Sequence, residues 1–476
     1  MSCPAGFASS RRAPFAATTE TLVPGERFQW WDYDIVWTEK HFPASRLEPL
    51  RQVGDLLADN ALAALDVKPG QNALAALREY TARPVEEQAS DAPRLLMQQL
   101  MTVPDWVDWA QVQRGQEVYW KYVLFISHAL LHFSLAGGFS IPKITKVLNS
   151  TGYLSGKRTK ERVLETSQFI LDVVHSLPTI QPGFGNKGWE SIIQVRFLHT
   201  GVRARLSKIS ERAQCPSSNK YYNIQEHGVP INQEDLLATL FSFSNTMWRV
   251  MDARMGVHMT AQEREDYLHL WRYIGYMMGV VDTLAATTTP KRADACLESI
   301  VLHLTDPDDS SGKMCASLLH NMASPSRLSR LASRLGLPDP FKVHMALAEH
   351  LLGPAFWTVN GLPRMTRPYK VFNKLVRWLM LLELWMAKSL PWWARIRSPL
   401  IRESQHWLIA REIGRSRTQF ELKVVPKDRA MMDDLADVVV RRQEGYGRLV
   451  VVVVWPKLLT AASAAVGVAL VLAQWV

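Results

Sequence analysis

Apolar residues recur at spacings of three and four from Leu47 to about Leu352, and no other feature constrains the fold of this chain as strongly. This spacing lines one face of a helix, whereas a half-buried strand needs alternation at every second residue. Gly and Pro clusters such as Pro69-Gly70 and Gly137-Gly138 interrupt the pattern where a helix must end. The sequence therefore predicts an all-α body made of many helices.

Changes in composition divide the 476 residues into four segments. We expect an N-terminal arm over 1–46, a large helical domain over 47–352, an amphipathic region rich in Trp and basic residues over 353–448, and a C-terminal transmembrane anchor over 449–476.

The anchor is predicted from residues 458–476, a stretch of nineteen residues without a charge. As a helix it would span about 28 Å, close to the ~30 Å hydrocarbon core of a bilayer. Arg441, Arg442, Arg448 and Lys457 precede it, and basic residues on this flank predict that the body faces the cytosol. The sequence thus predicts a single-pass membrane protein, with a buried core helix as the alternative.

A second apolar segment, between Pro354 and Leu408, combines Trp with Lys and Arg. Its apolar stripe consists of Phe372, Leu375, Val376, Leu379, Leu382 and Met386. Such a helix can lie in the bilayer interface with Trp near the headgroups. An ordinary core helix fits the pattern equally well.

The charge pattern argues against a nucleic-acid partner, and the cysteine spacing argues against a disulfide-rich fold or a cysteine metal site. The formal net charge is +10, but Lys and Arg alternate with Asp and Glu along most helices, so we expect no nucleic-acid partner. Attraction to an anionic membrane surface accounts for the excess of positive charge. Four scattered cysteines form neither a disulfide framework nor a metal-binding box.

Two segments carry the residues that suggest chemistry. Residues 159–175 place Arg162 and Thr166 four apart on an apolar helix, and residues 190–209 place His199 in the middle of another. A cation, a hydroxyl and an imidazole that converge in an apolar interior suit a haem pocket. On the residues alone, a histidine that only packs in the core is the alternative.

Two other motifs are not assigned a function. Gly183 to Gly188 matches the dinucleotide-binding pattern GxGxxG, but a helix precedes it, so we expect a connection between two helices. His128 and His132 stand four apart without a third ligand at a recognisable spacing, and neither is predicted to bind a metal.

The stretch from Pro104 to Leu206 resembles the family of latex-clearing rubber oxygenases and fungal ER-bound oxygenases of the mycophenolic acid pathway type. The similarity is carried by SLAGGFSIPKITKVLNSTGYL, RVLETSQFI and ESIIQVRFLHTGVRARL, and it weakens toward Gly279. It implies a globin-like haem-binding core with added helices, in which His199 is the proximal ligand of a haem b iron. It also implies that Arg162 and Thr166 lie in the haem pocket.

The resemblance implies an oxidoreductase that uses haem b and O2 on a lipophilic, isoprenoid or alkene-bearing substrate, by oxidative C=C cleavage. Residues 47–352 would then be the catalytic domain, and the endoplasmic reticulum the host membrane. Arg162 would stabilise negative charge that develops on oxygen, and Thr166 would donate a hydrogen bond to it. Arg196 and Arg203 flank His199, and we expect each to pair with a haem propionate or with an acid on a neighbouring helix.

The chain departs from the family at two positions. Rubber-cleaving members carry a catalytic Glu before the arginine, where residues 144–149 offer Lys146 and no acid, and they carry Lys where this chain has Glu165. The resemblance therefore supports haem binding by this chain more strongly than it supports rubber cleavage. Two alternatives follow, an inactive membrane-tethered carrier of haem or lipid and a scaffold without haem. The oligomeric state stays open.

Overall fold

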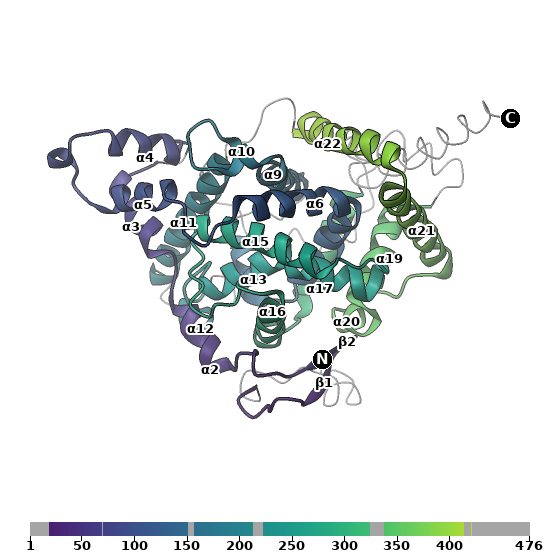
Figure 1. Ribbon diagram of the computed structural model, residues 1–476. Helices are drawn as coiled ribbons and strands as arrows, with labels where there is room; N and C mark the ends of the chain where they lie inside the picture. The colour runs from purple at the N-terminus through teal and green to yellow at the C-terminus, as the bar shows by residue number, and fades with distance from the viewer. Residues whose placement is uncertain are drawn as a thin grey trace.

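The computed structural model describes residues 19–68, 70–150, 157–212, 222–323, 338–413 and residue 420. These residues form helices and one short β-hairpin, which confirms the predicted all-α body (Figure 1). The predicted transmembrane helix within 449–476 lies outside the described residues. Of the helices that are described, none is by itself long and apolar enough to cross a membrane. One pair bent by 100°, Trp109–Gly138 with Pro142–Leu148, has the required length and composition.

The N-terminal arm packs onto the body through a hairpin. Strands β1 (Arg27–Trp30) and β2 (Tyr33–Val36) pair antiparallel. The Tyr33 hydroxyl donates to the carbonyl of Leu351 at 2.6 Å, and the Asp32 carboxylate accepts the N–H groups of Ala355 and Phe356. The arm is therefore fixed against the helices near residue 355.

The first half of the helical body contains α2 (Ala44–Leu47), η1 (Glu48–Gln52), α3 (Leu56–Leu65), α4 (Ala73–Thr81), η2 (Val85–Glu87), α5 (Ala92–Met101), α6 (Trp109–Ala129), η3 (Leu130–Leu135), α7 (Ala136–Gly138), α8 (Pro142–Ser150), α9 (Lys157–Val174), α10 (Leu177–Ile180) and α11 (Lys187–Arg212). The second half contains α12 (Ile224–His227), α13 (Gln233–Phe243), α14 (Asn245–Val250), η4 (Met251–Met255), α15 (Ala261–Met277), α16 (Pro290–Leu304), α17 (Asp309–Met322), α19 (Pro340–Leu352), α20 (Pro354–Val359), α21 (Arg367–Ser389) and α22 (Pro391–Ile413).

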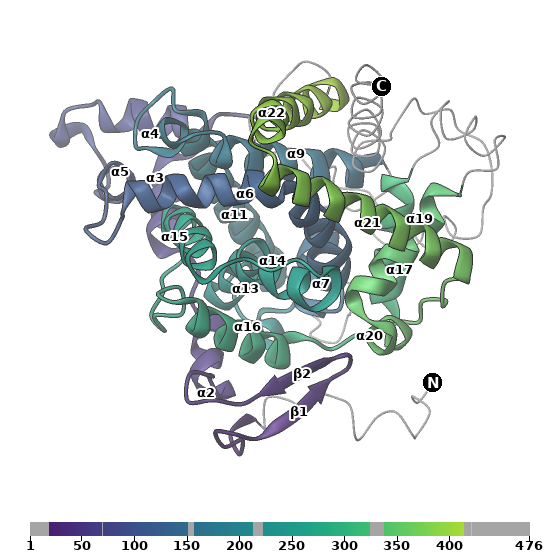
Figure 2. The same ribbon diagram turned by 45° about the vertical axis from the view of Figure 1, so that its right-hand side comes forward.

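Helix α6 runs through the centre of the molecule (Figure 2). It begins at Asp108, whose carboxylate accepts the N–H groups of Ala110 and Gln111 and so satisfies donors that the first turn leaves unpaired. It continues through the π-helical segment η3 into α7. Helix α15 packs along it, and the large buried side chains Trp248 and Trp271 belong to the same core.

Gly115 sets the distance between α6 and α15. A Cβ atom at this position would overlap the carbonyl oxygen of Asp266 and lie 2.8 Å from Cβ of Leu270. We therefore expect Gly115→Ala to lower the free energy of unfolding by about 2 kcal/mol, because two backbones must separate. Gly138→Ala is the matched control, since nothing lies within 4 Å of its added Cβ. Chemical denaturation of both variants checks this, and equal losses would contradict it.

The two segments singled out from the sequence become neighbouring helices. Helix α9 carries Arg162, α11 carries His199, and the two helices contact each other directly. The glycine-rich segment between them connects α10 to α11, and Gly185 adopts a φ of +93° that favours glycine. The GxGxxG match is thus a connection between helices, as predicted.

The last helices cover one side of the body. Helix α21 packs against α19 and α6, whereas α22 lies across α9 and contacts α21. Figure 1 shows α22 along the top of the molecule and α21 down its right-hand side.

Candidate functional site

His199 lies near the middle of α11 and is partly buried. Burial, together with the positive charges of Arg203 and Arg162, lowers the pKa of its imidazole to about 4. The buried Nδ1 atom has no hydrogen-bond partner among the described residues. The ring is therefore neutral at pH 7, which is the form in which imidazole binds a metal. A neutral ring with an unpaired buried nitrogen fits an axial ligand of haem.

Arg162 faces the same region from α9, as its electrostatic effect on His199 indicates. One guanidinium nitrogen lies 2.7 Å from the carboxylate of Glu165, one turn further along the helix. Both side chains are largely buried, with 22% and 10% of their surface exposed. The acid that replaces the family lysine therefore holds the guanidinium in place.

Thr166 does not lie in the apolar interior that the sequence suggested. Its side chain is exposed, and its hydroxyl donates to the carbonyl of Arg162 at 3.0 Å. A threonine in a helix commonly makes this bond to the residue four positions earlier. Donation to oxygen by Thr166 stays a prediction, and it would require this hydroxyl to rotate away from the backbone.

Arg196 and Arg203 both pair with acids on α3, which is one of the two arrangements expected from the sequence. The buried Arg196 guanidinium binds the Asp55 carboxylate through two nitrogens, at 2.6 and 3.0 Å. Arg203 Nε lies 2.9 Å from both oxygens of Asp59, and a second nitrogen donates to the carbonyl of Ile231. These ion pairs attach α11 to α3. A role in binding a propionate stays a prediction for both arginines.

Helix α8 is the third helix at the site. Val147 packs against Val202 and Leu206, which follow His199 on α11. Lys146, in the region 144–149 where no acid matches the family glutamate, donates to Nε2 of His227 at 2.8 Å. Burial lowers the pKa of His227 to about 4, with a further contribution from Lys146, so this ring is a neutral acceptor.

A buried charged cluster attaches α8 to α13, and no sequence motif predicted it. Lys143 lies 3.0 Å from Glu234 and 2.9 Å from Asp235, both on α13. Burial alone would raise the pKa of Glu234, but the hydrogen bond from His303 and the charges of Lys143 and Arg51 lower it to about 2. The contacts of the cluster join residues 69 to 183 positions apart in the sequence, and no local spacing reveals such a contact.

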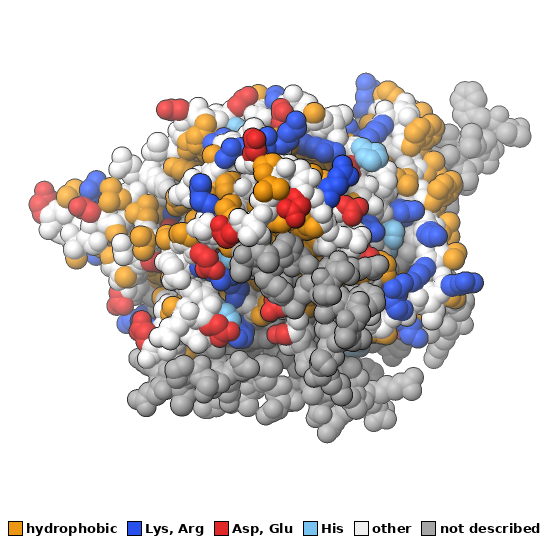
Figure 3. Space-filling view, turned by 90° about the horizontal axis from the view of Figure 1, so that it is seen from below, with side chains coloured by type: hydrophobic (Ala, Val, Ile, Leu, Met, Phe, Trp, Pro, Cys, Tyr) orange, Lys and Arg blue, Asp and Glu red, His pale blue; other side chains and the backbone are white. Residues whose placement is uncertain are grey.

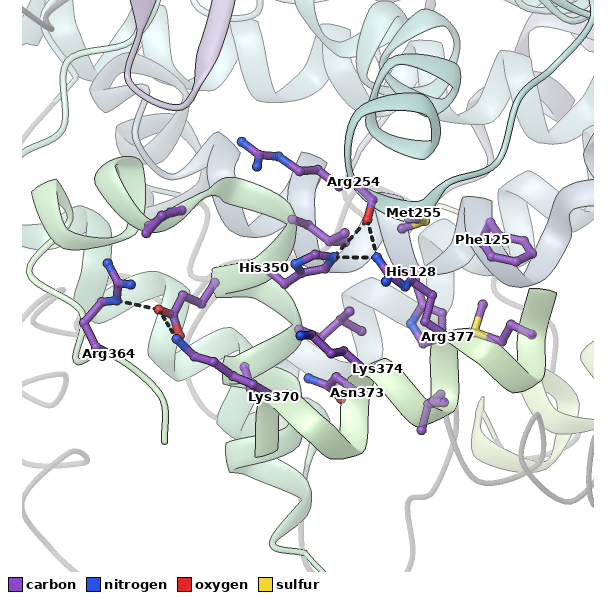
Figure 4. Close-up of a pocket in the computed structure, with 17 residues that line it drawn as sticks. Phe125, His128, Arg254, Met255, His350, Arg364, Lys370, Asn373, Lys374 and Arg377 are labelled. Carbon is purple, nitrogen blue, oxygen red and sulfur yellow. Dashed lines mark hydrogen bonds and ion pairs between the residues drawn. The ribbon is translucent and has the colours of Figure 1, made fainter. Parts of the chain in front are cut away.

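A cavity lies beneath α21 (Figure 4). It has a volume of about 200 Å³, and neither His199 nor Arg162 lines it. Apolar side chains such as Phe125 and Met380 form part of its wall, and Arg254, His350, Lys374 and Arg377 bring basic groups to it. Arg377 and His350 both bond to the carbonyl of Arg254, at 3.1 and 2.8 Å.

The described residues contain no group of three or more His, Cys, Asp or Glu side chains that could together hold a metal ion. A haem iron differs from such sites, because a single axial histidine is enough to hold it.

Comparisons with known proteins agree with the motifs. The family model described as the catalytic domain of ER-bound oxygenase mpaB/B′ and rubber oxygenase matches residues 120–381. A rubber oxygenase from Streptomyces sp. (strain K30) is 25% identical over 240 residues, which are 50% of this chain and 55% of that relative. The chain thus spans about half the length of this relative. A solved structure of the latex clearing protein LCP in the closed state covers 85% of this chain and 94% of its own, with 19% identity and a TM-score of 0.48.

Proposed function

Because this chain belongs to the family of MpaB-type ER-bound oxygenases and rubber oxygenases, we propose that it is a haem b-dependent oxygenase acting on a lipophilic isoprenoid or alkene-bearing substrate. The observation that carries the proposal is His199, a neutral imidazole whose buried Nδ1 has no partner among the described residues. It stands at the position where the family motif places the haem ligand.

Haem b would be held by His199 and would supply the iron at which O2 is activated. The rest of the chemistry belongs to side chains of this chain. Arg162 would stabilise negative charge that develops during the reaction, because its guanidinium is always charged and largely buried. Its ion pair with Glu165 restricts where the guanidinium can lie.

Glu165 is also the carboxylate that we propose for proton transfer. Residues 144–149 contain no acid to match the family glutamate, and Lys146 in that region bonds to His227. Glu165, in contrast, is buried and lies beside Arg162. A base must come within hydrogen-bond reach of the proton it removes, and Glu165 meets this condition if the substrate lies against Arg162. C=C cleavage is the reaction we propose on this basis.

Membrane attachment completes the proposal. Residues 449–476 would anchor the chain with its body toward the cytosol, and the endoplasmic reticulum is the proposed host membrane. A substrate dissolved in lipid would then reach the enzyme without crossing water.

Oxygen uptake by the purified full chain tests the activity. We expect uptake with squalene but not with its saturated analogue squalane, because the proposed reaction needs a C=C bond. Arg162→Gln should lower the rate by about tenfold to a hundredfold while haem content stays the same, since one charged donor is lost.

Arg94→Gln is the matched control, because Arg94 also pairs with an acid three residues away but on exposed α5. It should leave the rate unchanged. Haem-loaded protein that consumes no oxygen with squalene would contradict the proposed oxygenase activity. It would favour an inactive carrier of haem or lipid, the alternative that the absence of an acid in residues 144–149 supports.

A further inference from the structure

Helix α21 turns an apolar stripe toward solvent. Val371, Leu375, Trp378, Leu382 and Trp385 follow one another at spacings of four and three, so they lie on one face of the helix. Between 38% and 63% of each residue is exposed. The opposite face, with Met380 and Leu384, is buried against the core. Helix α21 therefore has two opposite apolar faces. The core covers one of them, and the other is exposed to solvent.

Helix α22 extends this exposed stripe. Trp392, Ile396, Leu400 and Trp407 are 48% to 57% exposed, and their spacings of four and seven again define one face. Nine of the twenty exposed large hydrophobic residues described in the structure belong to these two helices, including every exposed Trp among them. Exposed apolar faces on two helices that contact each other are typical of an interaction site. We call these nine residues the α21–α22 face.

Basic side chains line one flank of the α21–α22 face. Lys370, Lys374, Arg377 and Lys388 share one side of α21. Figure 4 shows the first three projecting from α21 on the side of the cavity, together with Arg364 from the preceding loop. Residues 364–407 contain nine Lys and Arg against two Asp and Glu. Most of the net charge of +10 therefore lies in this region, and Lys and Arg gather at the right-hand side of Figure 3, where α21 lies in Figure 1.

The face is fixed rigidly to the body. Arg397 on α22 pairs with Glu383 on α21, and its other nitrogens donate to the carbonyls of Trp120 and Lys121 on α6 at 3.1 and 3.2 Å. Arg402 donates to the carbonyl of His175 next to α9 and lies 4.9 Å from the Trp120 ring centroid. Helix α22 thus connects the face to α9, the helix that carries Arg162.

We propose that the α21–α22 face docks on an anionic lipid bilayer, with its Trp side chains in the headgroup layer and its basic flank on lipid phosphates and carboxylates. Interfacial helices combine these two features, a Trp-rich apolar face and adjacent cations. A second copy of the chain would bring two strongly basic regions together. The uncharged residues 458–476 offer no counter-charge to the flank. The bilayer alone satisfies both the apolar and the basic parts.

This docking proposal rests on the proposed membrane location of the protein and does not depend on haem binding. The test is hydroxyl-radical footprinting of the full chain in nanodiscs, one chain per disc, made of phosphatidylcholine with or without phosphatidylserine. Each basic residue at an anionic surface is worth about fivefold in affinity. We therefore expect Trp378 and Trp385 to be oxidised about fivefold more slowly, or slower still, in the anionic discs. Met101, which is 44% exposed on α5, serves as the internal reference.

Charge variants sharpen the test. Lys374→Gln/Lys388→Gln should abolish the protection, whereas Lys40→Gln/Lys313→Gln, which removes the same charge from exposed positions elsewhere, should not. Glu403, an exposed acid on α22, reduces the positive charge, so Glu403→Lys should keep the protection at higher salt.

Equal oxidation of Trp378 in both kinds of disc would overturn the proposal. The proposal would also be overturned if Trp378 were protected in both kinds of disc and no charge variant changed this protection. In that case another part of the chain, and not the lipid, would shield the face. Either result leaves the proposed function intact, since haem absorbance and retention of the chain in neutral discs are measured in the same samples.

Discussion

Arg196→Met is expected to lower the free energy of unfolding by about 3 to 5 kcal/mol, since it leaves the buried Asp55 carboxylate without its partner. The same guanidinium also bonds to the side chain of Gln99 on α5 and to the carbonyl of Met277 on α15. One side chain of α11 thus holds α3, α5 and α15 around the helix that carries His199. Chemical denaturation of the wild type and the variant measures the loss.

The partner variant separates loss of the ion pair from loss of packing. Asp55 also caps α3 by accepting the N–H of Ala58, and asparagine keeps this bond without the charge. Arg196→Met/Asp55→Asn should therefore recover much of the stability. Arg83→Met is the surface control, because its pair with Glu79 is exposed and should be worth less than about 1 kcal/mol. A loss at Arg196 no larger than at Arg83 would contradict this account.

The sequence predicted the helical body and the neighbouring α9 and α11 helices because both depend on local patterns. Apolar periodicity defined the helices, and the glycines after α10 allowed the chain to turn into α11. Placement within a helix was harder. The predicted stripe on α21 and the exposed stripe share Leu375 and Leu382. The predicted stripe also contained Phe372, Val376, Leu379 and Met386, whereas the exposed stripe also contains Val371, Trp378 and Trp385. Apolar residues occupy two opposite sides of α21, so only its packing decides which of them faces the core.

The site shows the same limit. The motif predicted His199 and its family role, but the partners of Arg196 and Arg203 lie on α3, more than 140 residues earlier. An arginine beside a predicted haem ligand has the same local sequence whether it binds a propionate or an aspartate. The exposed position of Thr166 likewise depends on how α9 packs, which helical spacing does not define. Contacts between distant segments account for these differences.

Haem loss from His199→Ala is the largest effect that we expect, since no other described side chain is proposed to hold the iron. The alanine variant removes the neutral imidazole without removing a charge at pH 7, so the fold should persist. His258→Ala is the matched control, because His258 is an exposed histidine paired with Asp252 and distant in sequence from the site.

The absorption spectrum of the purified full chain tests the central claim most directly. The account predicts a Soret band and a b-type haemochrome in the wild type and in His258→Ala, and their loss in a folded His199→Ala variant. A folded wild-type protein that stays colourless when expressed with ample haem, or a Soret band that survives in His199→Ala, would contradict it.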